Sequence, residues 1–87
     1  MEYEWDENKA LTNMENHCID FVDVARFDWD GATIINDKRK DYGETRYLAL
    51  GKIKGRLMVL VFTWRGNTVR VISLRKANTR EVKSHGY

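Results

Sequence analysis

The chain has 87 residues, 43% of them hydrophobic, and a net charge of +2, which allows one domain with a small core. No apolar run approaches the roughly 20 residues of a membrane span, and the acidic start from Met1 to Glu7 does not resemble a signal peptide. One cysteine excludes an internal disulfide, so we expect a cytoplasmic protein without a membrane partner.

The charges are unevenly distributed along the chain. Residues 1–44 hold 12 acidic and 5 basic residues, a net charge of −7, whereas residues 45–87 hold 1 acidic and 10 basic residues, a net charge of +9. This asymmetry favours a basic working surface with an anionic partner. The two halves can also neutralise each other across the fold, and both interpretations can hold together.

The first part of the chain predicts a short strand and two helices. Residues 3–6 suit a strand, and Asp6 suits the N-cap of a helix over residues 8–17. Asp20 is placed to cap a second helix over residues 21–27, whose apolar side chains would pack on a sheet.

The remainder predicts a strand meander. A short strand is expected over residues 32–36, a charged loop over 37–44 and another strand over 45–53. A hairpin follows over residues 55–75, with Gly66-Asn67 at its turn.

The hairpin carries two different patterns. Its first arm is apolar on both faces, which predicts an interior strand covered on both sides. Its second arm alternates, which places Val69, Val71 and Ser73 on one face and Arg70, Ile72 and Leu74 on the other. Residues 76–85 suit a short final helix with few apolar side chains, so we expect weak anchoring. The predicted fold class is α+β, with two N-terminal helices packed on a mostly antiparallel sheet and a short C-terminal helix.

Three arginines, Arg65, Arg70 and Arg75, lie within eleven residues of the hairpin. The guanidinium fork suits phosphate better than the point charge of lysine does, although a single arginine at a strand end is commonly just solvated. Basic and aromatic residues together suit RNA, whose phosphates meet cations and whose bases stack on rings. Further residues of this kind are Arg46, Arg56, Trp64, Lys76 and Arg80. Trp64 can equally serve as a core residue at a strand end.

Other chemistries have little support in the sequence. Ligand spacings typical of a metal site, a P-loop and a GxGxxG motif are all missing, so we expect no metal and no cofactor. Cys18 is more typical of a small buried thiol than of a nucleophile. Cleavage of RNA would proceed by attack of a ribose 2′-hydroxyl on phosphorus, with guanidinium groups stabilising the added negative charge. His17, Glu44 and His85 are the candidates for moving the proton.

Several segments resemble the BrnT toxins over nearly the whole chain. The opening Tyr3-Glu4-Trp5-Asp6-Glu7-Asn8-Lys9-Ala10, followed by Asn13, His17, Phe21 and Ala25, is similar to their F-x-W-D-x-x-K…N…H-G…F…A pattern. The later segments Glu44-Thr45-Arg46-Tyr47, Thr63-x-Arg65-Gly66 and Val69 to Glu81 follow in the same order. Three positions depart from the family, with Cys18 in place of a glycine, Leu74 in place of an alanine and His85 in place of a common tyrosine.

The resemblance implies a single BrnT-like toxin domain over residues 1–87 with a RelE-like fold. Such a toxin of a type II toxin–antitoxin module would be a metal-independent endoribonuclease that inhibits translation and is neutralised by a BrnA-like antitoxin. It implies Arg65, Arg70 and Arg75 as catalytic residues, His17 and Lys9 as further site candidates, and His85 as a substitute acid or base. The alternative is a non-catalytic module whose arginines only bind RNA or a protein.

Overall fold

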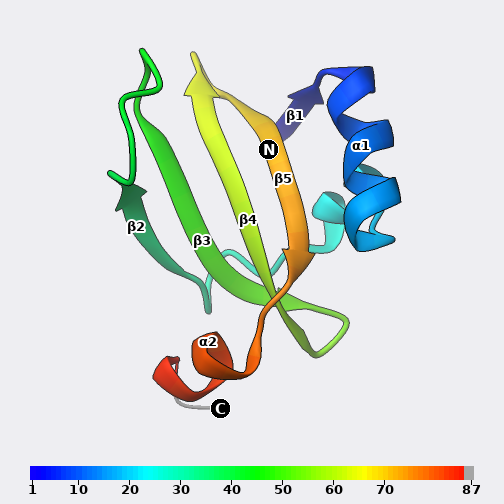
Figure 1. Ribbon diagram of the computed structural model, residues 1–87, viewed down its shortest axis with the longest axis vertical. Helices are drawn as coiled ribbons and strands as arrows, with labels where there is room; N and C mark the ends of the chain where they lie inside the picture. The colour runs from blue at the N-terminus through cyan, green and yellow to red at the C-terminus, as the bar shows by residue number, and fades with distance from the viewer. Residues whose placement is uncertain (86–87) are drawn as a thin grey trace.

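The computed structural model describes residues 1–85 of the chain. The elements in chain order are β1 (Glu2–Trp5), α1 (Glu7–His17), the 3-10 helix η1 (Phe21–Arg26), β2 (Thr33–Asp37), β3 (Arg46–Ile53), β4 (Arg56–Arg65), β5 (Thr68–Lys76) and α2 (Thr79–Ser84). The strands form one five-stranded sheet in the order β1-β5-β4-β3-β2 (Figure 1). Among residues 1–85, no helix is long and apolar enough to cross a membrane.

The sheet is mixed. The pairs β2–β3, β3–β4 and β4–β5 are antiparallel, as the predicted meander requires. β1 instead lies parallel to β5 at the sheet edge, because the intervening chain first passes through α1, η1 and the other strands. The N- and C-terminal parts of the chain are therefore neighbours in the sheet.

Asp6 caps α1 as predicted, and the helix begins at Glu7, one residue before the expected start. The carboxylate of Asp6 accepts a hydrogen bond from the backbone N–H of Asn8 at 2.7 Å and a longer one from Lys9 at 3.4 Å. These bonds satisfy backbone donors that the first helical turn leaves without partners. The helix ends at Cys18, whose backbone φ of 58° is left-handed. Glycine adopts this conformation most readily, which explains the glycine that the BrnT pattern has there.

Two expectations for this N-terminal region are wrong. The fold does not have two N-terminal helices packed on the sheet, because residues 21–26 form only a 3-10 helix. The buried side chains Phe21, Val24 and Phe27 are three residues apart, a spacing that matches three residues per turn and not 3.6. The thiol of Cys18 is exposed and not buried, because it occupies the turn after α1.

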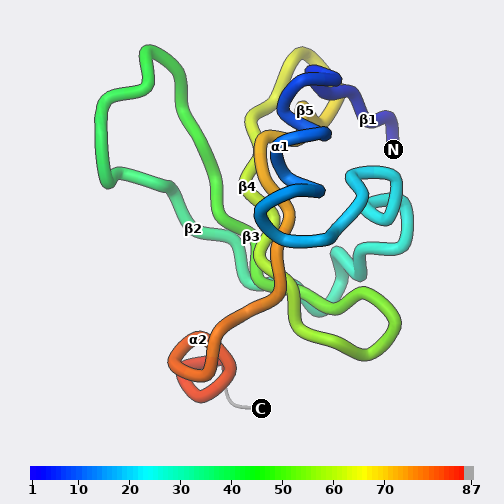
Figure 2. Tube along the Cα trace, turned by 45° about the vertical axis from the view of Figure 1, so that its right-hand side comes forward, coloured from blue at the N-terminus to red at the C-terminus, as the bar shows by residue number. Residues whose placement is uncertain are grey.

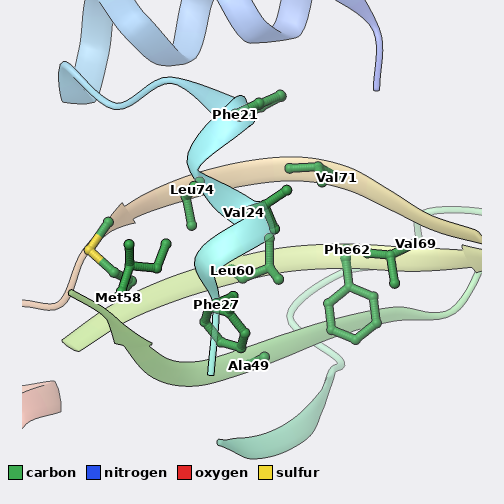
Figure 3. Packing of buried hydrophobic residues seen from close by; sticks show 11 residues of the cluster. Phe21, Val24, Phe27, Ala49, Met58, Leu60, Phe62, Val69, Val71 and Leu74 are labelled. Carbon is green, nitrogen blue, oxygen red and sulfur yellow. The ribbon is translucent and has the colours of Figure 1, made fainter. Parts of the chain in front are cut away.

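The core lies between η1 and one face of the sheet (Figure 3). Phe21, Val24 and Phe27 point toward the strands, where Ala49, Ile53, Met58, Leu60, Phe62, Val69, Val71 and Leu74 complete the buried cluster. Phe27 packs so closely on β3 that a Cβ at Gly51 would lie 2.6 Å from its Cζ. Glycine at this position therefore lets η1 settle on the sheet.

The alternation predicted for β5 is wrong beyond Val71. Leu74 is buried in the same core as Val69 and Val71, although strict alternation would place it on the opposite face. In β4, Phe62 pairs with Val71 and the preceding residue Val61 pairs with Ser73. Ile72 therefore has no partner in the ladder and is an extra residue in β5. After such a β-bulge, every residue of the strand points to the face opposite to the one that strict alternation predicts.

The side chain of Asn13 fastens α1 to the edge of β5. The paired stretch of β1 ends at Trp5, opposite Val71. Further along the edge, Asn13 donates to the carbonyl of Leu74 at 2.8 Å and accepts from its N–H at 3.1 Å. The same amide donates to the carbonyl of Ile19 at 3.0 Å, which holds the turn after α1. One side chain thus takes the place of a neighbouring strand.

We expect Asn13→Ala to lower the free energy of unfolding substantially. Asn13 is 5% exposed, so its removal leaves backbone groups of Leu74 without partners and out of water. Each buried polar group without a partner costs about 1–3 kcal/mol. Urea denaturation measures the change, with exposed Asn16→Ala as the control on the same helix. Equal stability of the two variants would contradict this role of Asn13.

Candidate functional site

The bulge brings two predicted arginines onto one face. Arg70 pairs with Thr63 and Arg75 pairs with Val59 across the β4–β5 ladder. Residues five apart in a regular strand point to opposite faces. Because Ile72 adds one residue between them, Arg70 and Arg75 both emerge on the sheet face opposite η1.

Two more arginines share this face. Arg65 lies two residues after Thr63 in β4, and Arg46 in β3 is on the same side as Leu48, the partner of Val61. We call this surface the arginine face, defined by Arg46, Arg65, Arg70 and Arg75. All three arginines predicted to be catalytic therefore lie on one face, spread along it, since Arg75 pairs with Val59, six residues before Arg65 in β4.

The floor of the arginine face is apolar. Val59 and Val61 point away from the η1 core, yet they are 0% and 8% exposed. By register, Val59 lies between Leu50 and Arg75. Arginine side chains commonly cover apolar surface with their methylene stems and leave the guanidinium in water. The prediction that the first hairpin arm is covered on both sides is confirmed.

Each guanidinium of the arginine face has a carboxylate partner. Arg70 donates to Glu4 of β1 at 2.5 Å. Arg46 and Arg65 both contact Glu44, at 3.4 Å and 3.6 Å. These acceptors come from the acidic first half of the chain, so the two halves do neutralise each other across the fold.

Arg75 connects the sheet to α2. Its two terminal nitrogens donate to the two oxygens of Glu81 at 2.8 Å and 2.9 Å. The hydrogen bonds from Arg75 lower the pKa of Glu81, and the carboxylate raises the pKa of Arg75. Glu81 also forms a capping box with Asn78 at the start of α2. Polar contacts therefore anchor this helix, which Figure 2 shows beyond the end of the sheet.

A buried carboxylate, Asp37, organises the charged loop after β2. The side chain of Asp37 is 1% exposed. It accepts two hydrogen bonds from the Arg39 guanidinium, both at 2.8 Å, one from the Arg39 backbone N–H at 3.2 Å and one from the Tyr42 hydroxyl at 3.1 Å. The hydrogen bonds from Arg39 hold the pKa of Asp37 well below its usual range. The Tyr42 ring also lies 4.1 Å from the guanidinium carbon of Arg46, so the loop supports the arginine face.

A polar hollow of about 350 Å³ lies beside the arginine face, between α1 and β5. Its lining residues are Asp6, Asn8, Lys9, Thr12, Asn13, Asn16, His17, Ile72 and Ser73. We call it the α1–β5 hollow. It includes the site candidates Lys9 and His17. Ser73 pairs with Val61, so it also belongs to the arginine face and connects the two surfaces.

The other predicted RNA contacts are dispersed. Trp64 is 44% exposed on the η1 side, where its ring packs edge-on against Phe62 at 5.8 Å. Arg56 and Lys76 line a separate hollow on that side. Arg80 is exposed on α2, and His85 is the C-cap of the same helix.

Sequence reasoning missed the carboxylates that hold the arginines. Glu4 and Arg70 are 66 residues apart, so no local pattern connects them. The opposite charges of the two halves are the only sequence signal for such pairing. Within residues 1–85, no group of three His, Cys, Asp or Glu side chains is placed to hold a metal ion.

A small mixed sheet with a row of arginines on one face is suited to a phosphate-bearing ligand. The family model "Ribonuclease toxin, BrnT, of type II toxin-antitoxin system" matches residues 5–81, so the chain belongs to the BrnT family of ribonuclease toxins. The chain is also similar to the ribonuclease toxin BrnT of Brucella abortus, solved by crystallography at 1.1 Å. The sequences are 30% identical, with a TM-score of 0.73 over 91% of this chain and 99% of that chain. A search among curated proteins found no match.

We expect Asp37→Asn to destabilise the protein and to flatten its acid response. The pKa of Asp37 is lower in the folded chain than in the unfolded chain, where it is about 3.9. Its stabilising effect is therefore complete above about pH 5 and is lost as the pH falls further. At neutral pH, Asn at this position weakens charge-assisted bonds to Arg39, a loss on the order of 1–3 kcal/mol.

Denaturation at a series of pH values between about 7 and 2 measures both effects. Exposed Asp30→Asn is the control, because no partner holds that carboxylate among the described residues. Parallel stability curves for Asp37→Asn and the wild type would contradict the assignment.

Proposed function

We propose that the arginine face binds and cleaves RNA, that this cleavage inhibits translation, and that a BrnA-like antitoxin neutralises the protein by covering the face. The observation that carries the proposal is the β-bulge at Ile72, which places Arg70 and Arg75 on the same face as Arg65. Family membership supports a ribonuclease, and the proposal adds where cleavage occurs and by which residues.

The proposed reaction uses the ribose 2′-hydroxyl of the RNA as nucleophile. It attacks the adjacent phosphorus while the 5′-oxygen of the next nucleotide leaves. Negative charge grows on the phosphate oxygens, and fixed guanidinium groups stabilise it. We assign this role to Arg65, Arg70 and Arg75, without a metal ion. His17 and His85 are the proposed proton-transfer groups, each worth about 10²–10⁴ in rate.

Arg70 and Arg75 differ in how many donors remain for phosphate. A guanidinium has five N–H donors. Arg70 gives one nitrogen to Glu4, whereas Arg75 gives both terminal nitrogens to Glu81. Arg70 is therefore the better placed to grip a phosphate directly. Arg75 reaches RNA only if Glu81 shares or releases it.

The pairing of all four guanidinium groups of the arginine face with carboxylates is the observation that favours the alternative. In a non-catalytic module the same ion pairs would only stabilise the sheet and α2. These pairs are only partly exposed but remain in contact with water. Ion pairs at the surface contribute about 0–1 kcal/mol, so phosphate can compete for them. Substitution of the arginines separates the two interpretations.

We expect Arg65→Ala and Arg70→Ala to abolish RNA cleavage and toxicity while the fold survives. Both side chains end at the surface, so stability should change by about 1 kcal/mol or less. Arg70→Lys should also be damaging, because an ammonium group does not reproduce a two-point grip on phosphate. The matched control is Arg26→Ala, which removes an exposed Arg26–Asp23 pair from η1, the element on the other side of the sheet.

Arg75 needs its own control because it also anchors α2. Glu81→Ala releases the same contact but leaves the guanidinium in place. Loss of cleavage in Arg75→Ala but not in Glu81→Ala would assign the effect to the guanidinium. If folded Arg65→Ala, Arg70→Ala and Arg75→Ala variants all remain as toxic as the parent, the catalytic proposal fails.

The antitoxin should protect the arginine face and the basic tail from Lys76 to Tyr87. Gly86 and Tyr87 lie outside the described residues. Masking the RNA site is the direct way to inhibit it, and the contacting antitoxin segment should be acidic. Hydrogen exchange of the complex should show protection along β4, β5 and α2. Protection and crosslinks confined to residues 1–44 would argue against this arrangement.

A further inference from the structure

The α1–β5 hollow lies at the edge of β5, between the end of β1 and the point where α1 contacts the strand. β1 covers the edge of β5 as far as Val71, and Asn13 covers it again at Leu74. Between them, Ile72 and Ser73 line the hollow. Its volume of about 350 Å³ is at the lower end of the range for ligand sites, which is roughly 300–1,000 Å³.

Most polar side chains around the hollow, Asp6 and Asn13 excepted, have no hydrogen-bond partner among residues 1–85. Within residues 1–85, none of the side chains of Asn8, Lys9, Thr12, Asn16, His17 and Ser73 makes a hydrogen bond or ion pair. On the arginine face, by contrast, every guanidinium is already paired. The hollow thus offers amide, hydroxyl, ammonium and imidazole groups that remain available to a ligand.

The basic and acidic side chains of α1 are placed differently relative to the hollow. Lys9, Thr12 and Asn16 are three and four residues apart and share the side that faces β5. Neither glutamate of α1 lines the hollow. Glu7 lies on the opposite side of the helix, and Glu15 lies next to Thr12, just outside the lining. The one carboxylate in the lining, Asp6, accepts the N-cap hydrogen bonds of α1. Apart from this carboxylate, the lining carries no negative charge to repel an anionic strand.

We propose that the α1–β5 hollow binds one unstacked nucleobase of a single-stranded RNA, next to a phosphate held by Arg70. This inference rests on the proposed function for the identity of the ligand. Ser73 lines the hollow and also lies between Arg70 and Arg75 on the arginine face, so the two surfaces are continuous. Amide and hydroxyl groups match the donors and acceptors of base edges, and the imidazole of His17 offers a ring on which a base can stack.

Binding of the four nucleoside 3′-monophosphates, followed by NMR of the side-chain amides, tests the inference without relying on catalysis. We expect saturable shifts of the Asn8 and Asn16 amide resonances, with Asn36 and Asn67 as distant internal references. The double variant Thr12→Ala/Asn16→Ala should weaken binding of the preferred nucleotide about tenfold. The control Glu7→Ala, on the opposite side of the same helix, should leave binding unchanged.

The second measurement is the base preference of RNA cleavage. We expect the double variant to relax the preference at a single position beside the cleaved bond. Unchanged preference in the variant, or nucleotide shifts that avoid Asn8 and Asn16, would overturn the inference even if the toxin cleaves RNA. Nucleotide binding at the hollow in a protein that cleaves no RNA would support the inference and overturn the proposed function instead.

Discussion

The extra residue Ile72 in β5 decides which side chains of that strand reach the core and which reach the arginine face. Without it, Leu74 would leave the core and Arg75 would point away from Arg70. The bulge lies where the paired stretch of β1 ends, so it also coincides with the gap that becomes the α1–β5 hollow. Core packing and the proposed RNA surface therefore depend on one local irregularity, and neither can be redesigned without the other.

Internal ion pairs change how the charge asymmetry should be interpreted. The arginine face does not present bare guanidinium groups, because Glu4 and Glu44 from the first half and Glu81 near the end of the chain hold them. These pairs fix the guanidinium groups on an apolar floor before any ligand arrives. Because the guanidinium groups are already held in place, less conformational entropy is lost when a phosphate binds them. The phosphate must, however, compete with the carboxylates for the same N–H donors. The balance favours ligands that offer several phosphates at once.

Local patterns were sufficient for most elements of the fold. Asp6 and the stripe after it predict α1, and the apolar arms with a glycine turn predict the β4–β5 hairpin. The spacing of Phe21, Val24 and Phe27 contained the evidence for a 3-10 helix, but the capping residue Asp20 is equally compatible with an α-helix. The parallel pairing of β1 with β5 and the bulge are non-local, because the register is fixed only when distant strands meet.

The proposed site likewise has features that the sequence predicts and features that only the fold determines. The residue types and the family resemblance predict Arg65, Arg70 and Arg75 as site residues, but their common face requires a bulge that alternation does not reveal. The structure also makes the three arginines unequal, which their sequence positions do not. Arg75 is bound through both terminal nitrogens to a carboxylate that caps α2, whereas Arg70 keeps most of its donors. A phosphate that takes Arg75 must share it with Glu81 or displace this carboxylate, so the proposed occupation of the full arginine row is coupled to the residue that caps α2.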